Sequence, residues 1–175
     1  VEAREAIALW QRLGYGFLGR TPDYKASFMA GLSVNADYYG RFASTAKAWY
    51  REFTEKGLYL NHVIINPPID RKRPIHEMGN EFIRVVRETD GGIIVSGAKM
   101  LATGSAITHA SFVAPVASAV LEQGKAEDFA IVFFVRMNNP KANLICRAPF
   151  GTKAPFDQPL ASRFDENDAV LVLDE

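Results

Sequence analysis

The pattern of this sequence changes within one short stretch, which reads Leu60-Asn61-His62-Val63-Ile64-Ile65-Asn66-Pro67-Pro68-Ile69-Asp70-Arg71. Inside it, the β-branched run from Val63 to Ile65 is typical of a buried strand. Pro67 and Pro68 cannot donate hydrogen bonds to a β-ladder, so the strand must end there and the backbone must turn. The stretch therefore predicts a rigid turn, with a histidine before it and a charged Asp-Arg pair after it.

Helical periodicity comes before this stretch. Apolar residues at helical spacing predict a first helix that ends at Gly14. Thr21 as N-cap, followed by a proline, predicts a second helix that runs to about Leu32. Asn35 is expected to cap a third helix, which ends at Gly57. The first third of the chain is therefore expected to be helical.

Short β-rich segments follow this stretch, at residues 82–87, 92–102, 111–116, 129–135, 143–147 and 169–173. Turn signals between them, such as Asp90-Gly91-Gly92, favour antiparallel pairing. Helices followed by strands predict an α+β fold, in which N-terminal helices precede an antiparallel β-barrel or sandwich. The polar stretch from Ala117 to Asp128 is expected to form a mobile hairpin loop.

Composition excludes several classes of function. The chain has 175 residues, of which 48% are hydrophobic, and its 20 basic and 20 acidic residues cancel. A chain without a basic field is not expected to bind nucleic acid or an anionic membrane. The single cysteine, Cys146, excludes an internal disulfide and a cysteine-built metal cage, and a reducing, cytoplasmic setting is expected. Because both ends fall within predicted elements, we expect a piece of a longer protein.

Three groups of residues could carry chemistry. His62 has a side chain that exchanges a proton near neutral pH, although a histidine beside an apolar strand can also be a core residue. Arg20 and Tyr24 lie four residues apart at a helix start and could hold an anion, or could be a capping arginine and a surface tyrosine. The segment Met100 to Ala106 could approach a flat ligand or could form a β-turn. His76 and His109 lack metal-ligand spacing, so no metal is predicted.

The order of these motifs resembles a known family, the oxygenase component of 4-hydroxyphenylacetate 3-monooxygenase. This is the large subunit of a two-component, FADH2-dependent phenol hydroxylase with an acyl-CoA-dehydrogenase-like fold. The motifs that carry the resemblance are Gly19-Arg20-Thr21-Pro22-Asp23-Tyr24, Asn61-His62, Asn66 to Arg71, Glu88-Thr89-Asp90, Val95 to Lys99, Ala102-Thr103-Gly104-Ser105-Ala106 and Ser162 to Ala169. They extend over essentially the whole chain.

The resemblance implies a domain organisation. Residues 1–57 would be the end of an N-terminal helical domain, and residues 58–175 the central β-domain that faces flavin and substrate. A C-terminal helical bundle, through which the family forms homotetramers and completes its flavin site, is absent from this chain. The sequence departs from the family around residues 148–153, where the family carries several more residues in a Gly-rich segment.

The resemblance also implies site residues and a reaction. Arg20, Tyr24 and His62 would line the pocket beside the flavin. The flavin contacts would come from His62, Val63, Pro68, Ile69, Asp70, Arg71, Thr103, Gly104 and Ser105. FAD, reduced by a separate reductase component, would react with O2 to give a C4a-hydroperoxyflavin that hydroxylates a 4-hydroxyphenylacetate-like phenol ortho to its hydroxyl group.

In this reaction His62 would take the phenolic proton, Arg20 would stabilise the phenolate, and Tyr24 would donate a hydrogen bond. Three alternatives remain open. Two keep the fold, namely a protein like 4-hydroxybutyryl-CoA dehydratase and one like acyl-CoA dehydrogenase. The third is an inactive fragment or binding module.

Overall fold

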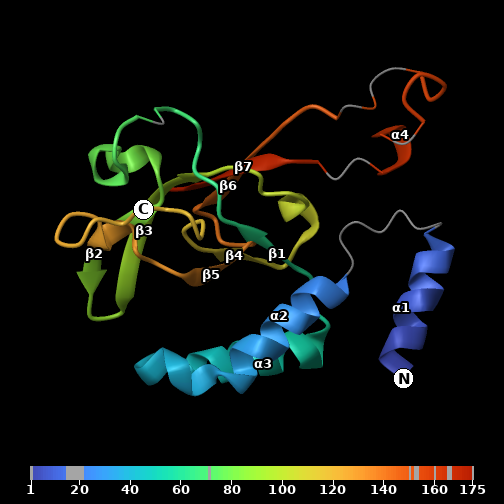
Figure 1. Ribbon diagram of the computed structural model, residues 1–175, viewed down its shortest axis with the longest axis horizontal. Coiled ribbons are helices and arrows are strands. Elements are labelled where there is room, and N and C mark those ends of the chain that lie inside the picture. The colour runs from blue at the N-terminus through green and yellow to red at the C-terminus, as the bar shows by residue number, and fades with distance from the viewer. Residues whose placement is uncertain are drawn as a thin grey trace. The chain divides into compact units, whose positions relative to one another are not determined.

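The computed structural model describes residues 2–14, 22–70, 72–149, 151, 154–159, 161–164 and 167–174. The chain divides into two compact units, Val1–Tyr59 and Leu60–Glu175 (Figure 1). No helix among the described residues is both long enough and apolar enough to cross a membrane. The roles predicted for residues 1–57 and 58–175, as the end of a helical domain and a flavin-facing domain, stay predictions.

The first unit is helical, as expected. Its elements are α1 (Glu2–Leu13), α2 (Pro22–Val34), the 3-10 helix η1 (Ala36–Phe42) and α3 (Ala43–Lys56). The prediction of one continuous helix after Asn35 was wrong, because Gly40 has φ 51° and ψ −120° and interrupts it. Asn35 does not cap this segment either, since its Nδ2 donates to the Gly31 carbonyl at 3.0 Å and so caps the end of α2.

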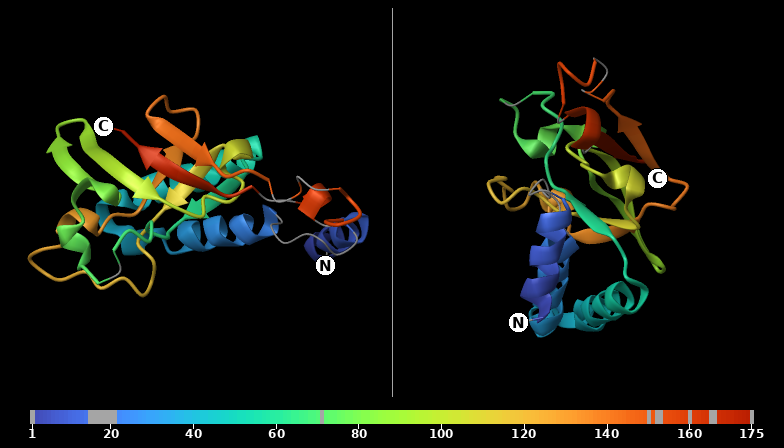
Figure 2. Two further views of the ribbon diagram at one scale, coloured as in Figure 1. Left: turned by 90° about the horizontal axis from the view of Figure 1, so that it is seen from above. Right: turned by 90° about the vertical axis from the view of Figure 1, so that its right-hand side faces the viewer.

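The second unit contains two sheets (Figures 1 and 2). The first has the order β1 (Leu60–Val63), β4 (Ala110–Val113), β5 (Phe133–Arg136). The second has the order β2 (Arg84–Thr89), β3 (Gly92–Lys99), β7 (Ala169–Leu173), β6 (Ala142–Cys146). Short helices complete the unit, namely η2 (Ile75–Glu77), η3 (Gly79–Glu81), η4 (Ser105–Ile107), η5 (Glu127–Phe129) and α4 (Ala161–Phe164).

The predicted barrel was wrong, and the pairing is not wholly antiparallel. The strands form two separate open sheets, and β1 pairs with β4 in parallel. A parallel pair needs a long crossover connection, and here that connection contains the β2–β3 hairpin of the other sheet. The α+β class is confirmed, but the strands form two open sheets rather than one closed barrel.

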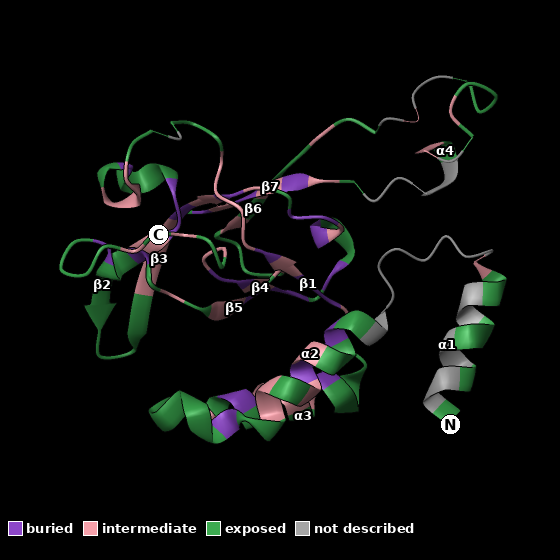
Figure 3. Cartoon of the chain, in the orientation of Figure 1, coloured by how far each residue is buried: buried purple, intermediate pink, exposed green. Residues whose placement is uncertain are grey.

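The main core of this unit is built from both sheets (Figure 3). It joins Val63, Val113 and Val135 of the first sheet to Leu171 and Leu173 of the second. A smaller cluster contains Met78, Phe82, Ala126 and Phe129, with Leu121 packed against it. Residues 117–128 connect β4 to β5, and this cluster anchors their loop at Leu121 and Ala126, while most of the residues between and after them are exposed. The mobility predicted for this loop stays a prediction.

Candidate active site

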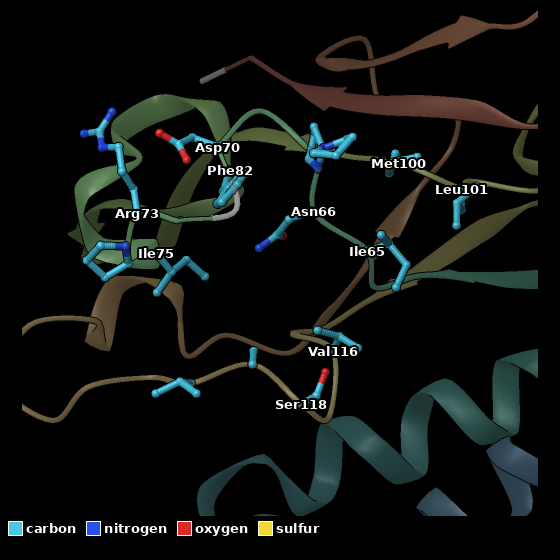
Figure 4. A pocket seen from close by; sticks show the side chains of 15 residues that line it. Ile65, Asn66, Asp70, Arg73, Ile75, Phe82, Met100, Leu101, Val116 and Ser118 are labelled. Atoms are coloured by element: carbon cyan, nitrogen blue, oxygen red, sulfur yellow. The ribbon is translucent and has the colours of Figure 1, made fainter.

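A pocket of about 660 Å³ lies within the second unit (Figure 4). Its walls come from three segments that are far apart in the sequence, namely residues 65–75, residues 100–101 and residues 116–120, together with Phe82. Most of the lining is apolar, and the polar side chains are those of Asn66, Asp70, Arg73 and Ser118. A mostly apolar wall with a few placed polar groups is typical of a site for a small organic ligand.

One wall of the pocket is the turn that the sequence predicts, residues 65–70, which we call the Pro–Pro turn. The Met100 amide donates to the Ile65 carbonyl at 2.8 Å, and after the two prolines the Ile69 amide donates to the Pro67 carbonyl at 2.9 Å. Asp70 Oδ1 accepts from the Lys72 amide at 2.9 Å. The backbone of this wall is therefore fixed before a ligand arrives.

Lys99 supports this wall from inside the protein. The side chain is buried, with 5% of its surface exposed, and its Nζ donates to the Ile64 carbonyl at 3.1 Å. Burial lowers the pKa of Lys99 from 10.5 to about 8, because the charged ammonium loses hydration. At neutral pH the buried positive charge of Lys99 therefore makes the folded protein less stable.

This lowered pKa predicts a pH dependence of stability. Between pH 8 and 10.5 the unfolded chain holds the Lys99 proton more often than the folded chain does, so the free energy of unfolding rises with pH there, by about 3 kcal/mol in total. We expect Lys99→Met to remove this rise. Denaturant titrations of both proteins across this pH range measure the difference, and two parallel curves would show that Lys99 does not titrate in this way.

A buried polar cluster joins the β1 strand to the loop at residues 103–105. Asn61 is 5% exposed, and its Nδ2 donates to the Thr103 carbonyl at 3.1 Å and to Ser105 Oγ at 2.5 Å. Its Oδ1 accepts from Ser111 Oγ on β4 at 2.5 Å. Because buried polar groups stabilise only when they are paired, Asn61 ties three distant segments together.

The hydroxyl groups of the same loop face the protein interior. Thr103 Oγ1 donates to Asp168 Oδ1, and the Ala102 amide donates to the Ala169 carbonyl at 2.9 Å. Ser105 is 1% exposed. Gly104, with φ 71°, adopts the left-handed conformation that turns the chain into η4. A ligand at this loop would therefore meet backbone atoms rather than the two hydroxyl groups.

His62 lies on the other face of β1 from Asn61 and Val63. It is half-buried, and the strand register aligns it with Phe112 on β4, which in turn aligns with Phe134 on β5. The two phenylalanine rings are 5.3 Å apart. Residues opposite each other in a sheet share a face, so these three side chains form an aromatic row. His62 is not among the described residues that line the pocket.

A family model, described as the 4-hydroxyphenylacetate 3-hydroxylase N terminal, matches residues 1–175. The chain belongs to this family. It is 63% identical over 175 residues to the pyoverdin chromophore biosynthetic protein PvcC of Pseudomonas aeruginosa, covering 99% of this chain and 35% of that protein. It is 52% identical over 179 residues to the 4-hydroxyphenylacetate 3-monooxygenase oxygenase component of the same organism, covering 99% and 34%.

Among solved structures, the chain is similar to that of HpaB, the oxygenase component of 4-hydroxyphenylacetate 3-monooxygenase, complexed with FAD and 4-hydroxyphenylacetate. The TM-score is 0.78 at 29% identity, over 95% of this chain and 35% of that chain. The resemblance found in the sequence is thus confirmed. The chain spans about a third of the length of the relatives that it matches.

The structure places only some of the site residues predicted for this 4-hydroxyphenylacetate 3-hydroxylase family member in the pocket. Pro68 and Asp70 line it. Ile69, in the same turn, is 58% exposed, whereas Val63 is fully buried in the core. Arg20 and Arg71 lie outside the described residues.

The convergence of Arg20, Tyr24 and His62 stays a prediction. Tyr24 belongs to the first unit, is 58% exposed, and has the Lys25 ammonium 4.4 Å from its ring centroid. His62 belongs to the second unit. The flavin contacts predicted for the family's Pro68–Arg71 turn and Thr103–Ser105 loop also stay predictions.

Sequence reasoning assigned no role to several residues that build the site. Asn66 and Phe82 line the pocket, and Lys99 and Asn61 hold its surroundings in place. Met100, which also lines the pocket, belongs to the segment that the sequence predicts could approach a flat ligand. No group of three or more potential metal ligands occurs among the described residues.

Proposed function

We propose that this chain is part of the oxygenase component of a two-component, FADH2-dependent monooxygenase that hydroxylates a phenol ortho to its hydroxyl group. The observation that carries the proposal is the family match over the whole chain, together with a preformed, mostly apolar pocket at the turn where the family resemblance expects flavin contacts.

The residues of the pocket fit a flavin ring. Such a ring needs a flat apolar contact surface and a few hydrogen-bond partners, and the pocket offers the apolar side chains of Met100 and Phe82 and the polar residues Asn66 and Ser118. The Pro68–Arg71 turn and the Thr103–Ser105 loop would hold FAD through their backbone atoms, with His62 completing the contacts, whereas Val63 is fully buried in the core and is not open to a ligand. When bound, reduced FAD supplies the electrons with which O2 is activated.

The chain's own residues would then prepare the phenol. His62 takes the phenolic proton, which makes the ring more nucleophilic, since a phenol with a pKa near 10 is protonated at neutral pH. Arg20 stabilises the phenolate, and Tyr24 donates a hydrogen bond to the substrate. The apolar walls exclude water and so suppress the release of hydrogen peroxide.

The identity of the phenol is left open by the relatives' names, which include 4-hydroxyphenylacetate and 4-nitrophenol monooxygenases and the pyoverdin chromophore protein. A 4-hydroxyphenylacetate-like substrate is the starting proposal, because the solved HpaB complex contains this compound. We also propose a separate flavin reductase as partner, a homotetramer as the assembly and the cytoplasm as the location.

The test is hydroxylation by the protein at its natural full length, supplied with reduced FAD, O2 and a panel of phenols. We expect a catechol from each accepted phenol, and no product from a phenol with both ortho positions methylated. Chromatography with mass detection measures the product. Flavin binding without any catechol would instead favour a binding module.

A further inference from the structure

Leu101 combines a backbone conformation that leucine disfavours with an exposed apolar side chain. Its φ is 59°, in the left-handed region that glycine adopts freely and that crowds the Cβ of any other residue against its own backbone. Among the residues that the structure describes, the other non-glycine with positive φ is Asn167, and asparagine tolerates this region better than leucine does. A glycine would suit the backbone at position 101 better, so the presence of leucine points to a use for its side chain.

The backbone around Leu101 is anchored on both sides. Before it, the Met100 amide donates to the Ile65 carbonyl at 2.8 Å, and after it, the Ala102 amide donates to the Ala169 carbonyl at 2.9 Å. Ala102 is fully buried in the main core. The surrounding fold therefore imposes the left-handed conformation on Leu101, and its side chain leaves the backbone in a fixed direction before any ligand arrives.

Packing inside the described part of the second unit does not account for this side chain. Leu101 is 46% exposed and does not belong to the main core. It lines the pocket next to Met100 (Figure 4), so a ligand in the pocket can reach it without any change in the protein. An exposed apolar side chain gains free energy when another apolar surface covers it.

We propose that Leu101 is a ligand-binding residue whose side chain packs against a planar aromatic ring bound in this pocket. The inference rests on the proposed function, and it names a binding residue for that same site. The isoalloxazine of FAD and the ring of a phenol both present such an apolar surface. Ile65 and Met100 extend the same apolar wall, and the strained backbone of Leu101 holds its side chain where the ring binds.

The first experiment tests for strain at Leu101 in the ligand-free protein at its natural full length. Glycine is less stable than alanine at an ordinary strand position, but at a left-handed position alanine keeps the strain and glycine relieves it. We therefore expect the thermal midpoint of Leu101→Gly to exceed that of Leu101→Ala by about 2 °C. Ile93 of β3, which is 47% exposed and does not line the pocket, is the matched control. Ile93→Gly should have a lower midpoint than Ile93→Ala, and the same order at both positions would overturn the proposal.

The second experiment measures the dissociation constants for FAD, and for 4-hydroxyphenylacetate in the presence of FAD. In Leu101→Ala and Leu101→Gly we expect one of these constants to rise about fivefold, because contact with about half of a leucine side chain is lost. Leu101→Met keeps the apolar volume and should stay within about twofold of wild type, and Ile93→Ala should be unchanged. A rise for FAD identifies the isoalloxazine as the ring that covers Leu101, and a rise for 4-hydroxyphenylacetate alone identifies the phenol.

Unchanged constants for both ligands in Leu101→Ala and Leu101→Gly would overturn the proposal. Catechol formation by the wild-type protein separates this result from a failure of the proposed function. A wild type that forms catechol, with Leu101 variants that bind both ligands normally, refutes the role of Leu101 alone. A wild type that forms no catechol but binds FAD fivefold more tightly than Leu101→Ala refutes the proposed function alone, and one that binds neither ligand refutes both.

Discussion

Replacing His62 with alanine is expected to lower the rate of phenol hydroxylation by about 100- to 10,000-fold, which is the usual contribution of a positioned general base. This corresponds to about 3–5 kcal/mol of transition-state stabilisation. The reason is that the ring reacts through its phenolate form, and imidazole is the side chain suited to accept that proton near neutral pH. The rate of catechol formation measures this loss. The amounts of catechol and of hydrogen peroxide formed per reduced FAD consumed measure the coupling.

The fold supports a specific role for His62 rather than a structural one. His62 is half-buried on the aromatic face of the first sheet, so its removal leaves the core face of β1 intact. His109→Ala, at an exposed histidine just before β4, is the matched control and should retain full activity. We also expect His62→Ala to release hydrogen peroxide in place of catechol. A His62→Ala protein that keeps the wild-type rate and coupling would refute the assignment.

Replacing Gly97 with alanine is expected to destabilise the protein by about 3 kcal/mol or more, within the range of severe overpacking and backbone strain. A Cβ at Gly97 would lie 2.2 Å from the Phe82 carbonyl oxygen and 2.6 Å from the Ile83 nitrogen. These are backbone atoms and cannot rotate away. The φ of Gly97 is 119°, a conformation that residues with side chains rarely adopt.

The effect should reach the pocket as well. Gly97 pairs with Leu173 of β7, and the next residue bridges to Phe82, a pocket residue. Gly91→Ala is the matched control, because a Cβ there meets only the Thr89 hydroxyl at 4.0 Å, and it should change stability by less than about 1 kcal/mol. Denaturant titration compares the two variants. Equal, small losses would show that Gly97 is not tightly packed.

Local sequence signals predicted most of the elements but not all of their bounds, and they did not predict the strand pairing. The strand expected at residues 63–65 is β1 (Leu60–Val63), and the segment expected from Phe129 becomes a strand only at Phe133. Strand β7 has the predicted bounds, because the apolar run from Ala169 to Leu173 has turn residues before it. The predicted strand from Gly92 to Ala102 ends at Lys99 instead, since Leu101 has φ 59° and leaves the extended conformation. The parallel pairing of β1 with β4 depends on a crossover that no local pattern encodes.

The same limit applies to the site. The two prolines and the histidine were visible in the sequence, because their chemistry follows from residue type. The hydrogen bond from Thr103 to Asp168 joins residues 65 positions apart. The sequence could therefore not show that the Thr103 hydroxyl group binds another protein residue instead of a ligand. The unpaired Oδ1 of Asn66 could not be predicted either, because no local pattern shows whether the rest of the fold provides a hydrogen-bond donor for it.

The most direct test of the account is an experimental structure of the protein at its natural full length with FAD and a phenol bound. We predict that the isoalloxazine or phenol ring contacts the pocket wall formed by the Pro–Pro turn. A structure in which both ligands bind away from this turn, with the pocket filled by protein side chains, would contradict the account.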